Sequence, residues 1–136
     1  MFRKFGHKTG ALTRMMQSAE PAALAQIKGD SAHSQLHGTV SFYPFGGRTL
    51  VVAEVFGLPA ASGSCSHPVL GFHIHAGEAC SGTPEEPFKD ADGHFNPNGC
   101  DHPYHAGDLP PLFANDGYAF SAFLTDRFTV DEVIGR

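Results

Sequence analysis

The stretch LHGTVSFYPF-GGR-TLVVAEVFGL, from Leu36 to Leu58, decides the fold class. Two runs rich in β-branched and aromatic residues, 36–45 and 49–58, flank Gly46-Gly47-Arg48. Such runs around a glycine turn predict a β-hairpin. In the second run the even-numbered residues 50–56 share one face of the strand and the odd-numbered residues share the other.

Further short strands are predicted on the C-terminal side of this hairpin. Residues 69–75 and 118–123 have strand composition, and 133–136 resembles the start of another strand. Residues 22–28 could form either a short helix or a first strand. Residues 76–109 form a long loop rich in Gly, Pro, Asp and Asn, and loops of this length are usually functional. The pattern predicts an all-β fold, an antiparallel sandwich or barrel.

Composition limits the class of protein. The 136 residues fit one domain, which we place at 21–136 after an N-terminal extension at 1–20. A net charge of −5 argues against nucleic-acid binding, and no apolar run is long enough to predict a membrane span. Residues 1–17 are basic but lack the apolar stretch of a secretory signal. We interpret them as a disordered or loosely docked extension, with a transit peptide as the alternative, and expect a cytoplasmic location.

Metal-type ligands are concentrated between residues 73 and 108. His73 and His75 lie two apart on a predicted strand, so both imidazoles project from one face, as half of a metal site or as exposed strand histidines. Three histidines and one carboxylate then follow at spacings of eight, three and three, a set that suits tetrahedral structural zinc: His94, His102, His105 and Asp108.

These motifs resemble those of the copper-zinc superoxide dismutase family. The resemblance covers about residues 22–136 and is carried by GFHIH at 71–75, HFNP at 94–97, His102, HAGDL at 105–109 and VIGR at 133–136. It implies an eight-stranded Greek-key β-barrel that converts superoxide to O₂ and hydrogen peroxide, with a homodimer as the implied assembly.

The same resemblance implies the role of each ligand. Copper would be bound by His73, His75 and His94, and zinc by His94, His102, His105 and Asp108. His94 would bridge the two metals and help to deliver protons. Cys80 would be the loop cysteine of the family's internal disulfide.

The chain departs from the family pattern after Arg136, because the fourth copper histidine and the last one to two strands would follow there. We therefore expect a C-terminally incomplete member whose own activity is weak or absent. The alternative is a complete, non-catalytic zinc-binding or metal-sequestering relative. Three cysteines are an odd number, so Cys80 lacks its mate while Cys65 and Cys100 could pair, unless all three are reduced thiols.

Overall fold

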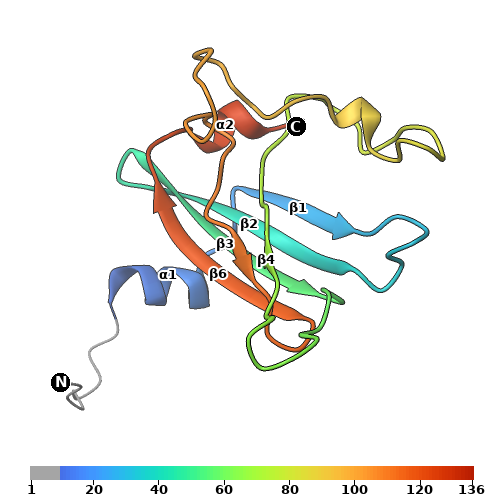
Figure 1. Cartoon of the computed structure of the whole chain (residues 1–136). Coiled ribbons are helices and arrows are strands. Elements are labelled where there is room, and N and C mark those ends of the chain that lie inside the picture. Colours follow the sequence, from blue (N-terminus) through green and yellow to red (C-terminus); the bar gives the residue numbers. More distant parts are fainter. Residues whose placement is uncertain (1–9) are drawn as a thin grey trace.

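A computed structural model describes residues 10–136 of the chain (Figure 1). Its main element is a four-stranded antiparallel sheet with the order β1-β2-β3-β6. These strands are β1 (Ala23–Lys28), β2 (His37–Phe45), β3 (Arg48–Phe56) and β6 (Tyr118–Thr125). A second, two-stranded sheet joins β4 (Val69–Leu70) to β5 (Leu112–Phe113). The helical elements are α1 (Ala11–Ser18), the 3₁₀ helix η1 (Lys89–Ala91) and α2 (Val130–Val133).

The predicted hairpin is confirmed as β2 and β3. Phe45 pairs with Arg48 across the turn, so Gly46 and Gly47 are the two turn residues. Their φ angles of 56° and 76° lie in the left-handed region that glycine adopts without steric cost. The turn chemistry therefore sets the register of the two longest strands.

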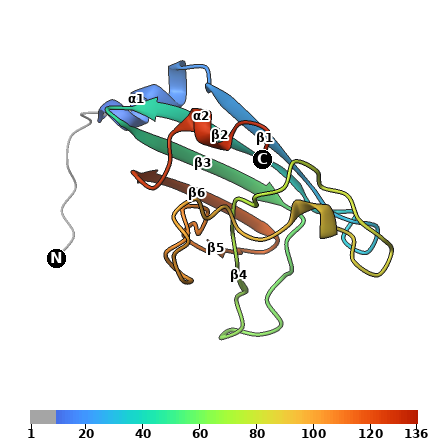
Figure 2. The same ribbon diagram turned by 90° about the horizontal axis from the view of Figure 1, so that it is seen from above.

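The hydrophobic core lies on one face of the four-stranded sheet. Three segments lie on this side of the sheet: strand β5, helix α2 and the loop after β4 (Figures 1 and 2). The buried core residues come from both layers: Val40, Phe42, Val51, Ala53, Val55, Phe95, Ala106, Leu109, Leu112, Ala119, Phe128, Val130 and Val133. The arrangement is an antiparallel sandwich, as the sequence predicts.

The opposite face of the sheet is covered at one end. Tyr43 and Leu50 are directly opposite each other on β2 and β3, and neither belongs to the core cluster, yet they are only 7% and 2% exposed. Helix α1 lies on this side of the sheet, away from α2 (Figure 1). Its apolar residues Leu12, Met15 and Met16 are partly buried. Part of the predicted extension is thus a docked helix, whereas residues 1–9 lie outside the described part of the chain.

Two strand predictions need correction. Of residues 69–75 only Val69–Leu70 form a strand, and beyond it His73 and His75 make isolated bridges, because their partners are loop segments. Residues 133–136 do not begin a strand, because Val133 ends α2. The Thr129 side chain and Glu132 form a capping box that starts this helix. The ambiguous segment 22–28 is resolved as strand β1.

The barrel form of the prediction is not observed, because the sheet is open. Strand β6 pairs with β3 and strand β1 pairs with β2, so β1 and β6 are both edge strands. The short β4–β5 pair does not connect these two edges. Among residues 10–136, no helix has the length and apolar character needed to cross a membrane.

Candidate metal centre

Backbone hydrogen bonds bring three distant segments together at one side of the core. The Phe95 N–H donates to the Ile74 carbonyl at 2.8 Å, and the Ile74 N–H donates to the Gly107 carbonyl at 2.9 Å. The Gly107 N–H in turn donates to the Phe95 carbonyl at 2.8 Å. Isolated bridges pair His73 with Asp108 and His75 with His94. The predicted ligands are therefore positioned by main-chain contacts between loops.

Gly107 is required where these segments meet. A Cβ atom at this position would lie 2.3 Å from the Ile74 carbonyl oxygen and 3.1 Å from the backbone nitrogen of Phe95. Its neighbour Ala106 is buried in the core, and so is Phe95. The adjacent His94 is instead half-buried in the ligand cluster. Buried neighbours thus anchor His94, through Phe95, and His105, through Ala106.

Three predicted histidine ligands converge on the carboxylate of the fourth predicted ligand, Asp108. Together they are called the four-ligand group here: His94, His102, His105 and Asp108. Asp108 Oδ1 lies 2.8 Å from His94 Nδ1, and Asp108 Oδ2 lies 3.1 Å from His102 Nδ1 and 3.3 Å from His105 Nδ1. The two nitrogens His94 Nδ1 and His105 Nδ1 are 3.3 Å apart. Tetrahedral zinc with bonds of about 2.0–2.1 Å would separate its donor atoms by about 3.4 Å. The donor spacing is close to that of such a site.

Asp108 is ionised and buried at the centre of this group. Its side chain is 6% exposed. Burial opposes ionisation, but the His105 N–H and the His94 ring hydrogen-bond to the carboxylate and lower its pKa. A buried carboxylate surrounded by imidazole nitrogens offers a negative charge to a cation.

The second cluster, called the three-histidine group here, consists of His73, His75 and His94, whose donor atoms lie within 4.8 Å of one another. The His73 and His94 rings are stacked, with centroids 3.9 Å apart and planes at 18°. Burial is the main cause of the lowered pKa of His73, and the nearby His94 lowers it further. The lower pKa favours the neutral form of His73, which is the form that binds metals. Because stacked rings do not point their nitrogens at one atom, this group would need ring rotation to bind a metal.

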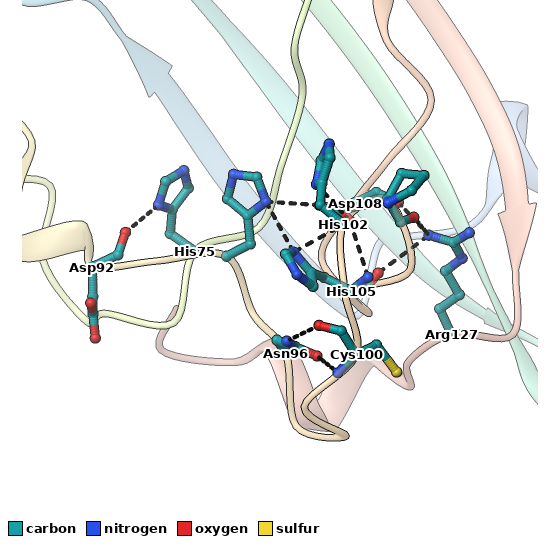
Figure 3. A network of polar contacts seen from close by, with 10 residues as sticks. His75, Asp92, Asn96, Cys100, His102, His105, Asp108 and Arg127 are labelled. Atoms are coloured by element: carbon teal, nitrogen blue, oxygen red, sulfur yellow. Dashed lines mark hydrogen bonds and ion pairs between the residues drawn. The ribbon is translucent and has the colours of Figure 1, made fainter.

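A main-chain carbonyl fixes the tautomer of His75 (Figure 3). His75 Nδ1 donates to the carbonyl oxygen of Asp92 at 2.7 Å, which leaves Nε2 available as a ligand. Asp92 adopts φ 60° and ψ −164°, a backbone region occupied almost only by glycine. The residue that orients His75 is therefore strained.

Arg127 is a contact residue that the sequence reading missed. Its Nη1 lies within 3.0–3.2 Å of the carbonyl oxygens of Pro103, His105 and Asp108 (Figure 3). No motif marks this arginine, which follows β6 in the sequence and lies 19 residues from the nearest of its partners. Only the folded chain brings it to the ligand cluster.

The predicted metal ligands lie together, whereas the cysteines that could pair, Cys65 and Cys100, are not bonded to each other. Cys65, Cys80 and Cys100 are exposed and free. Asn96 exchanges two hydrogen bonds with the backbone of Cys100, at 2.8 and 3.0 Å, and so closes the loop that follows His94.

An apolar cavity of about 560 Å³ opens beside the three-histidine group. It lies between the inner face of β1 and β2 and the segment of Phe72–His75, and Cys80 and Arg136 also line it. His73 and His75 border this cavity, whereas His102, His105 and Asp108 do not. The two groups therefore differ in their surroundings.

Comparison with known protein families matches residues 36–136 to the copper/zinc superoxide dismutases. Comparison with individual curated proteins finds no match. The matched segment spans most of the chain and contains every residue of both ligand groups. The antiparallel β-sandwich and the converging histidines agree with this assignment. The chain belongs to the copper/zinc superoxide dismutase family.

Proposed function

We propose that this protein is a superoxide dismutase whose zinc ion is bound by the four-ligand group and whose copper ion is bound by the three-histidine group. The observation that carries the proposal is the position of His94, which belongs to both groups. The two nitrogens of an imidazole lie on opposite sides of the ring, so one ring can serve two metals. Family membership supports both metals.

The donor chemistry supports zinc in the four-ligand group. Three imidazole nitrogens and one carboxylate oxygen form a set that suits tetrahedral Zn²⁺. All four protein positions are then filled, which is typical of a structural site. Zinc would fix the loop that contains His102 and His105 against the sandwich and add its binding free energy to folding.

The chemistry of the active centre would come from copper, which alternates between two oxidation states while one superoxide is oxidised to O₂ and another, with two protons, is reduced to hydrogen peroxide. His94 is suited to the proton transfer. Its Nδ1 lies 2.8 Å from Asp108 Oδ1, so Nε2 is the atom that remains for the copper side and for a proton. His75 would offer Nε2, because Nδ1 donates to Asp92.

A zinc-binding protein without dismutase activity is the second candidate. One observation favours it: the four-ligand group has donor spacings close to those of a tetrahedral site, whereas the three-histidine group has stacked rings. In this case zinc alone would be retained during purification.

Metal loading followed by a superoxide assay separates the two candidates. The purified chain is loaded with zinc and then copper, excess metal is removed with a chelator, and superoxide decay is followed by stopped-flow absorption. In keeping with the weak activity expected of this chain, we expect a small but measurable acceleration over the zinc-only protein, and loss of this acceleration in His75→Gln. No acceleration at verified copper occupancy would overturn the dismutase proposal, and retained zinc would then support the second candidate.

A further inference from the structure

Arg127 lies on a rigid part of the fold. It lies two residues after the end of β6, and its backbone N–H donates to Thr125 Oγ1 at 3.2 Å. The next residue, Phe128, is 3% exposed, and its carbonyl accepts a 2.9 Å hydrogen bond from the buried Thr49 hydroxyl of β3. The main chain on both sides of Arg127 is thus fixed to the sheet.

From this position the side chain reaches the loop of residues 102–108, called the ligand loop here. Arg127 Nη1 lies 3.2 Å from the Pro103 carbonyl, 3.2 Å from the His105 carbonyl and 3.0 Å from the Asp108 carbonyl. One nitrogen carries only two hydrogens, so the three acceptors share them within the field of the cation. A single charged group therefore gathers three carbonyls of a loop that contains no helix or strand.

The carbonyl groups that accept hydrogen bonds from Arg127 belong to the predicted zinc ligands or to a neighbour of one. Two of the three carbonyls belong to His105 and Asp108, and the third belongs to Pro103, next to His102. Arg127 bonds the carbonyl of Asp108, and no hydrogen bond or ion pair joins it to the Asp108 carboxylate among the described residues. The carboxylate is left to face the histidines while its main chain is held.

We propose that Arg127 is a positioning residue for the zinc site, which sets the backbone of the ligand loop so that His102, His105 and Asp108 converge before the metal binds. The inference rests on the proposed zinc site. Groups that orient metal ligands typically change metal affinity 10- to 100-fold when they are removed. Arg127 therefore acts on zinc affinity through the loop and not through contact with the metal.

The test uses the full chain with Zn²⁺ as the probe, and competition with a chromophoric chelator gives the dissociation constant. Arg127→Gln should weaken zinc binding about tenfold or more. Arg127→Lys, which keeps the charge but has a compact ammonium group, should recover part of the affinity. Arg48→Gln is the matched control: Arg48 is an exposed cation at the same end of the sheet, where the adjacent Thr49 pairs with Thr125, and among the described residues no hydrogen bond or ion pair joins it to the ligand loop. This variant should bind zinc as the wild type does.

A spectroscopic measurement separates positioning from general stability. The absorption spectrum of the Co²⁺-loaded protein reports ligand geometry, and it should change in Arg127→Gln but not in Arg48→Gln. A lower melting temperature of the metal-free Arg127→Gln variant, with unchanged zinc affinity and cobalt spectrum, would overturn the inference and leave the zinc site intact. A wild-type chain that does not bind zinc would overturn both. If Arg127→Gln does not fold, Arg127→Lys carries the test, and wild-type affinity together with a wild-type spectrum would reject the inference.

Discussion

The four-ligand group of His94, His102, His105 and Asp108 contains a buried carboxylate, whereas the three-histidine group of His73, His75 and His94 contains imidazoles alone. In the first group Asp108 oxygens lie 2.8–3.3 Å from three ring nitrogens. In the second group two rings are stacked and an apolar cavity lies alongside. Two neighbouring clusters that share a ring thus differ in how their donor atoms are arranged.

The difference shows how a buried charge organises a set of metal ligands. The Asp108 carboxylate attracts ring nitrogens and hydrogen-bonds to them, so the fold itself brings them near coordination distance. No carboxylate belongs to the three-histidine group among the described residues, so its rings pack against each other. Metal binding there must rearrange side chains that the fold has placed close together.

The largest expected effect comes from removing the shared charge. Asp108→Asn should weaken zinc binding by more than about 100-fold, because it removes a direct ligand and not only an orienting group. Competition with a chelator measures the loss. Asp101→Asn is the control, since this exposed carboxylate lies in the same loop segment without a side-chain partner among the described residues. Equal zinc affinity in Asp108→Asn and Asp101→Asn would remove the basis for treating the two groups as different.

The second test separates the groups by metal. His75→Gln should weaken copper binding about tenfold or more and leave zinc binding unchanged, and His102→Gln should do the reverse. His94→Gln should weaken both, because this ring belongs to both groups. Metal content after dialysis, with paramagnetic resonance of the copper, gives the comparison. A His94→Gln variant that loses only one metal would show that the ring is not shared.

The third test uses acid on the metal-free protein. Burial lowers the pKa of His73, so the unfolded chain binds this proton more readily and stability falls as the pH drops below the usual histidine range near 6.5. The pKa of Asp108 is also lowered, so its contribution is present above the usual aspartate range and is lost as the pH falls through the folded value. Urea unfolding between pH 7 and pH 3 should show two separate losses of stability.

Variants assign these two losses to the two groups. His73→Gln should reduce the loss that begins near pH 6.5. Asp108→Asn should reduce the loss below about pH 4, to which Asp30 and Glu132 also contribute because their pKa values are lowered too. A stability curve that keeps both losses at full size in both variants would contradict the assignment.

The smallest expected effect concerns the strained Asp92. Asp92→Gly should stabilise the protein by about 1 kcal/mol, because glycine adopts its φ and ψ without strain. The His75 hydrogen bond would be kept, because it uses the main-chain carbonyl. Thermal unfolding should show a melting temperature higher by about 4 °C. Asp116→Gly is the control, since Asp116 has φ 49° in a turn where aspartate is readily accommodated. Equal shifts in both variants would contradict strain specific to Asp92.

The sequence could identify residues whose spacing along the chain indicates their structural or chemical role. The glycine turn set the β2–β3 hairpin, and the intervals among His94, His102, His105 and Asp108 predicted the cluster that the fold assembles. Both patterns are local, so they can be read without knowledge of tertiary contacts.

The features that the sequence could not reveal depend on distant partners. Arg127 carries no motif, because its role arises from three carbonyls that only the fold brings near. The segment around His73 has strand composition, but its partners are loops and it forms isolated bridges. Residues 133–136 have strand composition too, and the capping box of Thr129 and Glu132 overrides it.

A ring that belongs to two ligand groups makes two binding equilibria interdependent. His94 can adopt only one orientation at a time. An ion that fixes this ring would therefore change the affinity of the site for the other ion. Thermodynamic linkage requires the two effects to be equal: the factor by which zinc changes copper affinity is the factor by which copper changes zinc affinity. At the proposed two-metal site, the order of metal addition would therefore alter the path of loading and leave the final equilibrium unchanged.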